Sequence, residues 1–87
     1  MKFLVLETFR SDYKQLSRHI QEQVDKAILL LEQNPRHPSL RVKKIKGTRN
    51  VWEGRVTLAY RLTFNWEAGF ITLRRVGTHD ILKKEAR

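Results

Sequence analysis

The chain has 87 residues, enough for a single domain over residues 1–87 whose core buries only about 60–65% of the unfolded surface. It contains no cysteine and no apolar run long enough to span a membrane, so disulfides, thiolate metal sites and a membrane-spanning segment are excluded and a cytoplasmic protein is expected. Its 18 Lys and Arg against 9 Asp and Glu give a net charge of +9, which favours a nucleic acid or an acidic protein as the partner.

The N-terminal stretch predicts a strand and then a short helix. Residues 2–6 form a near-continuous apolar run, which is typical of a central strand. Ser11 is a good N-cap, with Asp12 in the first turn, for a helix over residues 11–16. One helix that continues to residue 33 is the alternative.

A longer helix is predicted over residues 18–33, with Ser17 as its N-cap. The dipeptide Asn34-Pro35 ends it, because proline cannot continue a helix. One face of this helix is apolar and is expected to pack on a sheet: Ile20, Val24, Ala27, Ile28 and Leu31.

The remaining chain predicts strands. Residues 40–47 indicate a short one, with Leu40, Val42 and Ile45 directed inward. Residues 51–80 then alternate with period two and predict three antiparallel strands, the last two joined by a hairpin at residues 67–69. The inward set is Trp52, Val56, Leu58, Leu62, Phe64, Trp66, Ile71 and Leu73.

The polar face of these strands carries Arg55, Arg61 and one of Arg74 or Arg75, between which the alternation does not decide. The predicted fold class is α+β, with two N-terminal helices on one face of a mainly antiparallel sheet of four or five strands. The other face is expected to be open and basic. Ile81 and Leu82 are expected to pack back on the core, ahead of a solvated tail over residues 83–87.

This order of elements resembles the RelE/ParE superfamily of toxins from type II toxin–antitoxin systems. The motifs that carry the resemblance are NPRHPSLRVKKIKG at residues 34–47, WEGRV at 52–56, AYRLTF at 59–64 and LRRVGTHD at 73–80. The Tyr60-Arg61 pair is similar to the RelE strand motif, and Gly77-Thr78-His79 is similar to the end of the YafQ branch.

The resemblance implies a ribosome-dependent endoribonuclease that cuts mRNA and is held inactive by an acidic antitoxin. It implies no metal and no cofactor, since cationic side chains hold the scissile phosphate while the 2′-hydroxyl of the RNA attacks it. Operator DNA is expected to be bound only by the toxin–antitoxin complex, and no membrane is involved. A ParE-like inhibitor of DNA gyrase and a non-catalytic RNA-binding module remain alternatives.

The chain departs from both branches. Ala59 stands where the YafQ branch has an aspartate, and no tyrosine follows His79 as it does in RelE, so the resemblance leaves the general base unassigned. Arg61 matches the RelE strand arginine, and His79 matches the terminal YafQ histidine.

Cleavage by a 2′-hydroxyl needs a base, an acid and charge on the phosphorane. Histidine suits a proton-transfer role because the unperturbed pKa of an imidazole is about 6.5, and His79 is the candidate. Asp80 either orients His79 or acts as a turn residue or N-cap. Arg61 and Arg75 are candidates for the scissile phosphate. No group of histidines or carboxylates has metal-ligand spacing. The candidate RNA-binding residues are Lys43, Lys44, Lys46, Arg55 and Tyr60, the last of which either stacks on a base or packs in the core.

Overall fold

Five strands form one sheet in the computed structural model, which describes residues 2–85 of the chain. The strands lie in the order β1-β5-β4-β3-β2, with β1 parallel to β5 and every other neighbouring pair antiparallel. Their bounds are β1 Lys2–Val5, β2 Lys43–Lys44, β3 Val51–Arg55, β4 Tyr60–Glu67 and β5 Phe70–Thr78.

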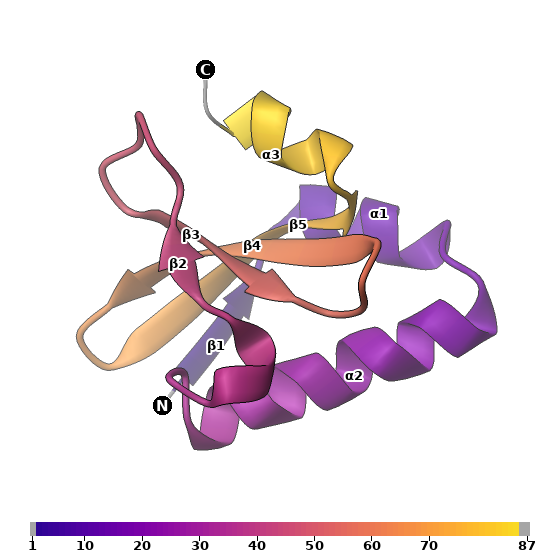
Figure 1. The fold of residues 1–87 in the computed structure, drawn as a ribbon, viewed down its shortest axis with the longest axis horizontal. Coiled ribbons are helices and arrows are strands. Elements are labelled where there is room, and N and C mark those ends of the chain that lie inside the picture. The colour runs from indigo at the N-terminus through magenta and orange to yellow at the C-terminus, as the bar shows by residue number, and fades with distance from the viewer. Residues whose placement is uncertain (1, 86–87) are drawn as a thin grey trace.

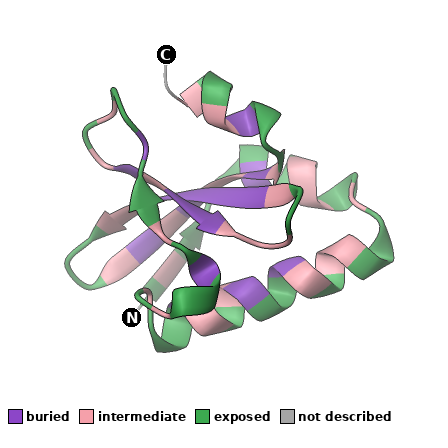
Figure 2. Ribbon diagram, viewed as in Figure 1, coloured by how far each residue is buried: buried purple, intermediate pink, exposed green. Residues whose placement is uncertain are grey.

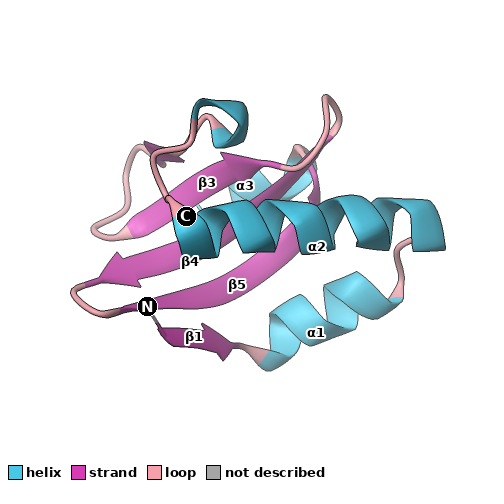
Figure 3. Cartoon of the chain, turned by 90° about the horizontal axis from the view of Figure 1, so that it is seen from below, coloured by secondary structure: helices cyan, strands magenta, loops and turns pink. Residues whose placement is uncertain are grey.

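Helices cover both faces of this sheet, which confirms the α+β class. In Figure 1 the strands run between α2 below and α3 above, and Figure 3 shows α2 crossing the sheet with α1 beside β1. The helices are α1 Glu7–Lys14, α2 Arg18–Gln33, the 3₁₀ turn η1 Pro38–Leu40 and α3 Asp80–Glu85. None of the helices within residues 2–85 has the length and apolar character needed to cross a membrane.

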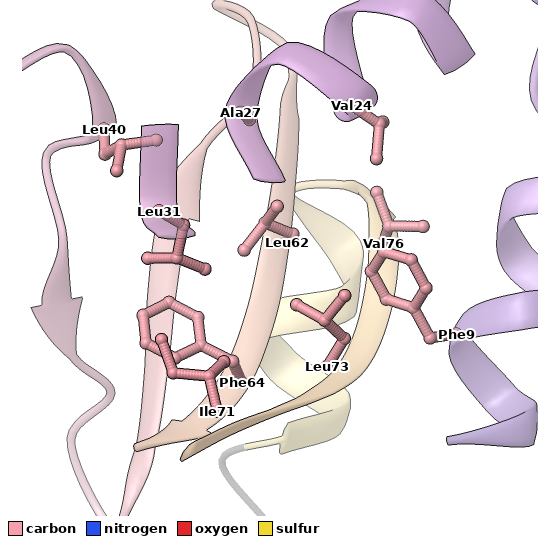
Figure 4. Close-up of a cluster of buried hydrophobic side chains, with 10 residues drawn as sticks. All are labelled: Phe9, Val24, Ala27, Leu31, Leu40, Leu62, Phe64, Ile71, Leu73 and Val76. Atoms are coloured by element: carbon pink, nitrogen blue, oxygen red, sulfur yellow. The ribbon is translucent and has the colours of Figure 1, made fainter. Parts of the chain in front are cut away.

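The core lies between α2 and the sheet, as the helical spacing of apolar residues predicts. The Ser17 hydroxyl accepts the amide of Ile20 and caps α2, as predicted. Figure 2 shows that β4 is buried over most of its length, because helices lie on both of its faces. The side chains drawn in Figure 4 form one cluster: Phe9, Val24, Ala27, Leu31, Leu40, Leu62, Phe64, Ile71, Leu73 and Val76.

A β-bulge at Arg74 resolves the alternation in β5. The register pairs Thr63 with Arg75 and Phe64 with Leu73, so Arg74 has no partner on β4. The extra residue returns Val76 to the same core as Leu73, although the two are three positions apart and regular alternation would put them on opposite faces. Alternation alone therefore could not decide which of Arg74 and Arg75 faces the same way as Arg61, and the bulge shows that Arg75 pairs with Thr63.

The first strand is an edge strand, not a central one. β1 pairs with β5 alone, and Leu4 and Val5 are 54% and 37% exposed. The first helix begins at Glu7, not at Ser11, because Leu6 already has the extended backbone of an N-cap and its carbonyl accepts the amides of Phe9 and Arg10. Two separate helices are observed, so the single long helix is excluded.

The segment over residues 40–47 forms far less strand than predicted. Leu40 is buried in η1, and Arg41 then takes the left-handed conformation (φ 46°), which leaves only Lys43 and Lys44 in pairing. Leu58, expected to point inward, is 80% exposed in the β3–β4 loop.

The face opposite α2 is not open. α3 lies over it, with Ile81 buried as expected and Glu85 bonded to the sheet. Lys83 and Lys84 are exposed as predicted, but they and Glu85 belong to a helix and not to a free tail. Residues 86 and 87 lie outside the described part of the chain.

Candidate functional site

Three arginines lie near one another, two on the sheet and one just before it, and we call Arg41, Arg55 and Arg61 the arginine row. Arg55 pairs with Arg61 across β3 and β4. Arg41 precedes β2, outside the paired residues, and lies close enough for its charge to lower the pKa of Arg61. Like charges directly opposite one another destabilise a sheet, so the row is held together against repulsion.

Arg61 is not on an open surface, as the alternation implied. It is 7% exposed, and its Nη1 donates to the carbonyl oxygens of Thr57, Leu58 and Tyr60 at 2.7, 3.2 and 2.9 Å. These bonds hold the β3–β4 loop in place. The guanidinium is therefore fixed in orientation before any ligand arrives.

The charge of the row is only partly balanced. Glu53 is a buried carboxylate, and its Oε1 lies 3.9 Å from the Nε of Arg61. Burial lowers the pKa of Arg61, and the charges of Arg55 and Arg41 lower that pKa further while Glu53 raises it. Among the described residues, the Nε of Arg55 is buried without a hydrogen-bond partner. An anion at this row would relieve the repulsion and satisfy that donor.

His79 lies at the end of β5, beside the row. On β5, Gly77 pairs with Arg61 and Thr78 pairs with Tyr60. His79 therefore follows two residues after the partner of Arg61. Its side chain is exposed and its carbonyl accepts the amide of Leu82 in the first turn of α3. Asp80 is exposed as the first residue of α3, and Tyr60 is half-buried at the start of β4.

Arg74 and Arg75 are both occupied by carboxylates. Arg74 Nε and Nη2 donate to Glu85 at 2.8 and 3.1 Å, and the hydroxyl of Thr63 donates to the same carboxylate at 2.7 Å. Arg75 Nε and Nη2 donate to Asp12 of α1 at 3.1 and 3.0 Å. These contacts raise the pKa of both arginines. Arg75, a candidate for the phosphate, is thus neutralised by Asp12, which also accepts the amide of Val76.

The lysines are divided between two places. Lys43 pairs with Glu53, next to the row. Lys44 pairs with Trp52 and points to the other face, because successive residues of a strand alternate. Lys46 lies beyond it, toward the β2–β3 loop and away from the row. All three are exposed.

Arg41 is a member of the site that the motifs did not single out. A left-handed conformation is unusual for a residue with a side chain, and such backbone strain gathers at functional sites. The signal that could have pointed to Arg41 was the strand predicted over residues 40–47, because a regular antiparallel strand there would have put residue 41 opposite Arg55. Within residues 2–85, no three histidine, aspartate or glutamate side chains gather to hold a metal ion.

We expect Glu85→Gln to lower the free energy of unfolding by about 1–3 kcal/mol at pH 7. Burial would raise the pKa of Glu85, but bonds from Arg74 and Thr63 outweigh it and leave that pKa below its usual range. A carboxylate with a lowered pKa stabilises the fold fully above its unfolded value of about 4.3 and loses that effect as the pH falls through the folded value.

The difference between wild type and Glu85→Gln should therefore shrink toward pH 3, as urea denaturation at both pH values will measure. Glu67→Gln is the matched control, because Glu67 is exposed at the end of β4; it should change stability by less than about 0.5 kcal/mol. Equal stability of Glu85→Gln and wild type at pH 7 would show that Glu85 does not hold α3 to the sheet.

No protein-family model matches the sequence, and no curated protein matches it. Solved structures do resemble the fold. A chain of the RelB–RelE antitoxin–toxin complex from Methanococcus jannaschii has a TM-score of 0.76 at 25% identity, over 97% of this chain and 99% of that one. YafQ from E. coli has a TM-score of 0.79 at 15% identity, over 93% of this chain and 96% of its own. A YoeB/ParE toxin from Agrobacterium tumefaciens has a TM-score of 0.76 at 16% identity, over 91% of this chain and 99% of that one.

These similarities extend over nearly the full length of each chain, so the whole arrangement of helices and strands is shared. The resemblance to the RelE/ParE superfamily is thereby confirmed at the level of the fold.

Proposed function

We propose that this chain, which has the RelE/ParE fold, is the toxin of a type II toxin–antitoxin system and cuts mRNA on the ribosome without a metal ion. The observation that carries the proposal is the arginine row beside His79. Three cations with one nearby carboxylate, Glu53, form a site for a phosphate, and His79 adds a group that transfers protons near neutral pH. The solved structures of similar fold are also named as toxins.

The reaction joins the 2′-oxygen of the RNA to phosphorus and releases the 5′-oxygen of the next nucleotide. Negative charge grows on the phosphoryl oxygens as the phosphorane forms, and prearranged cations lower that barrier most effectively. In the proposal Arg55 donates to the phosphate through its Nε, which has no hydrogen-bond partner within residues 2–85. Arg61, which the loop carbonyls hold in place, contributes positive charge that stabilises the phosphorane without a direct bond to it.

His79 then acts as the acid for the leaving 5′-oxygen or as the base for the 2′-hydroxyl, with Asp80 next to it in sequence. Tyr60, Lys43, Lys44 and Lys46 remain proposed RNA contacts, of which Lys43 and Tyr60 lie nearest the row by register. Arg75 is left out of the catalytic set, because Asp12 already holds it by two bonds.

The proposed partner is an acidic antitoxin, and its docking surface is an apolar groove between α1, α2 and β1. The groove has a volume of about 700 Å³, and Leu29 on its rim is 53% exposed. The outer edge of β1 is unpaired among the described residues, and it can accept an added strand. Apolar residues of the antitoxin would fill the groove, while its acidic residues meet the net charge of +9. Operator DNA would be bound by the complex.

The proposal is tested by incubating the purified chain with ribosomes that hold a defined mRNA and mapping the 5′ ends of the products. Cleavage within the mRNA is the expected result, and the same RNA without ribosomes should remain largely intact. A parallel assay follows supercoiling by DNA gyrase. Gyrase inhibition without cleavage would replace the proposal with the ParE-like function, and RNA binding without cleavage or gyrase inhibition would replace it with a binding module.

A further inference from the structure

A second cavity lies next to Arg41, in the segment between α2 and β2. Two tryptophans form part of its wall, together with Arg36, His37 and Arg41 from the segment that follows α2. Its volume of about 230 Å³ is below the range of about 300–1,000 Å³ typical of pockets for drug-sized ligands. The cavity is therefore suited to one ring system, not to a whole nucleotide.

The two indole rings make a corner. The ring centroids of Trp52 and Trp66 are 5.3 Å apart and the ring planes meet at 70°. Trp52 Nε1 donates to the side-chain oxygen of Asn50 at 3.1 Å, and the guanidinium carbon of Arg36 lies 5.4 Å from the Trp66 centroid. Both rings are half-buried, so the walls are held in place while part of their surface faces solvent.

The polar groups around the corner are hydrogen-bond donors. His37 Nδ1 accepts the amide of Ser39 at 3.2 Å, so the neutral ring carries its proton on Nε2, where it can donate. Arg36 and Arg41 are exposed cations. None of the described residues that line the cavity is acidic. Donors around aromatic walls suit an aromatic ring that carries acceptors and is attached to negative charge.

Arg41, a member of the arginine row, also borders this corner. It lines the cavity, and its charge lowers the pKa of Arg61. Trp66 shares the face of β4 that carries the core residues Leu62 and Phe64, whereas Arg61 points to the other face. Arg41 is therefore the cation of the row that can meet a phosphate beside the cavity. Bases stacked on aromatic side chains beside cations are the usual means of binding single-stranded nucleic acid.

We propose that the corner between Trp52 and Trp66 binds one nucleobase of a single-stranded RNA whose neighbouring phosphate lies against Arg41. The inference rests on the proposed RNA-cutting function, since it names where that substrate places a base. The walls supply stacking, and His37 and Arg41 supply donors to the base and its phosphate.

The test uses a strand of six 2′-O-methyl adenosines, which lacks the 2′-hydroxyl needed for cleavage, and a matched abasic strand with the same phosphates. The only two tryptophans of the sequence line the cavity, so intrinsic fluorescence reports on it directly. We expect the base-bearing strand to quench this fluorescence and to bind about 10- to 100-fold more tightly than the abasic strand. Equal affinity for the two strands, or binding without quenching, would overturn the proposal.

Variants separate base binding from phosphate binding. Trp66→Leu should bring the affinities of the two strands together. His37→Ala keeps both tryptophans and should also lower the ratio of the two affinities. It keeps the proposal testable if Trp66→Leu fails to fold. Arg41→Gln should lower the affinity for both strands, because it removes a phosphate contact. It should preserve most of the ratio between the two affinities. A ratio unchanged by both Trp66→Leu and His37→Ala would place the base elsewhere.

The affinity ratio does not depend on cleavage. A chain that discriminates between the strands but leaves ribosome-bound mRNA intact would refute the nuclease and keep the base site. A chain that cuts mRNA but binds the two strands equally would refute the base site and keep the nuclease.

Discussion

Replacing His79 with alanine is expected to lower the rate of cleavage of ribosome-bound mRNA by about 10²- to 10⁴-fold, because general acid–base catalysis contributes that much. The melting temperature should hardly change, since the side chain is exposed and only the backbone carbonyl of His79 bonds to α3. Single-turnover cleavage and thermal melting of the same preparations give the two quantities.

His79→Gln sharpens this prediction, because glutamine forms hydrogen bonds but does not titrate near neutral pH. It should be nearly as inactive as alanine, and the pH profile should lose one limb in both variants. His19→Ala is the matched control, since His19 is exposed on α2. Wild-type rates in both His79 variants would remove His79 from the mechanism and leave a purely cationic site.

Replacing Arg55 with glutamine should lower the cleavage rate by about 10²- to 10³-fold, the usual effect of one lost charge contact in the transition state. The free energy of unfolding should stay the same or rise by up to about 1 kcal/mol. The variant removes repulsion from Arg61 and a buried donor that has no partner among the described residues. Activity and stability would then move in opposite directions, as is common where a site is strained for function.

Arg49→Gln is the control for net charge, because it also removes one positive charge but lies exposed in the β2–β3 loop. Urea denaturation and single-turnover cleavage of both variants separate the two effects. A clear loss of stability in Arg55→Gln would show that Arg55 holds the sheet together. Arg61→Ala gives the contrast, because it should lose stability as well as activity when the loop carbonyls lose their donor.

Local patterns predicted the parts of the fold that local chemistry decides. The three strands β3, β4 and β5, the Ser17 cap and the apolar stripe of α2 are in the structure as predicted. The bulge at Arg74 is not a local property. It follows from the need to bury both Leu73 and Val76, and Asp12 of α1 supports it from 64 residues away by accepting the amide of Val76.

The site was predicted in the same uneven way. The motifs predicted Arg55, Arg61 and His79 as site residues. The register pairs Arg55 with Arg61, and it pairs Thr78, which precedes His79, with Tyr60. The alternation assigned Arg61 to an exposed face, because it contains no information about the loop that folds back over the guanidinium. The carboxylates that hold Arg74 and Arg75 lie 11 and 63 residues away, so only the three-dimensional fold shows that these arginines are occupied.

The sheet order sets a minimum length for any inhibitor that both fills the apolar groove and covers the arginine row. β5 and β4 separate β1 from β3, so three strand spacings, about 14 Å, lie between the edge of the groove and Arg55. An extended chain needs about four further residues to cross that distance. A peptide confined to the groove would leave the cations exposed to RNA, whereas a segment that continues across the sheet would anchor at one end and shield charge at the other.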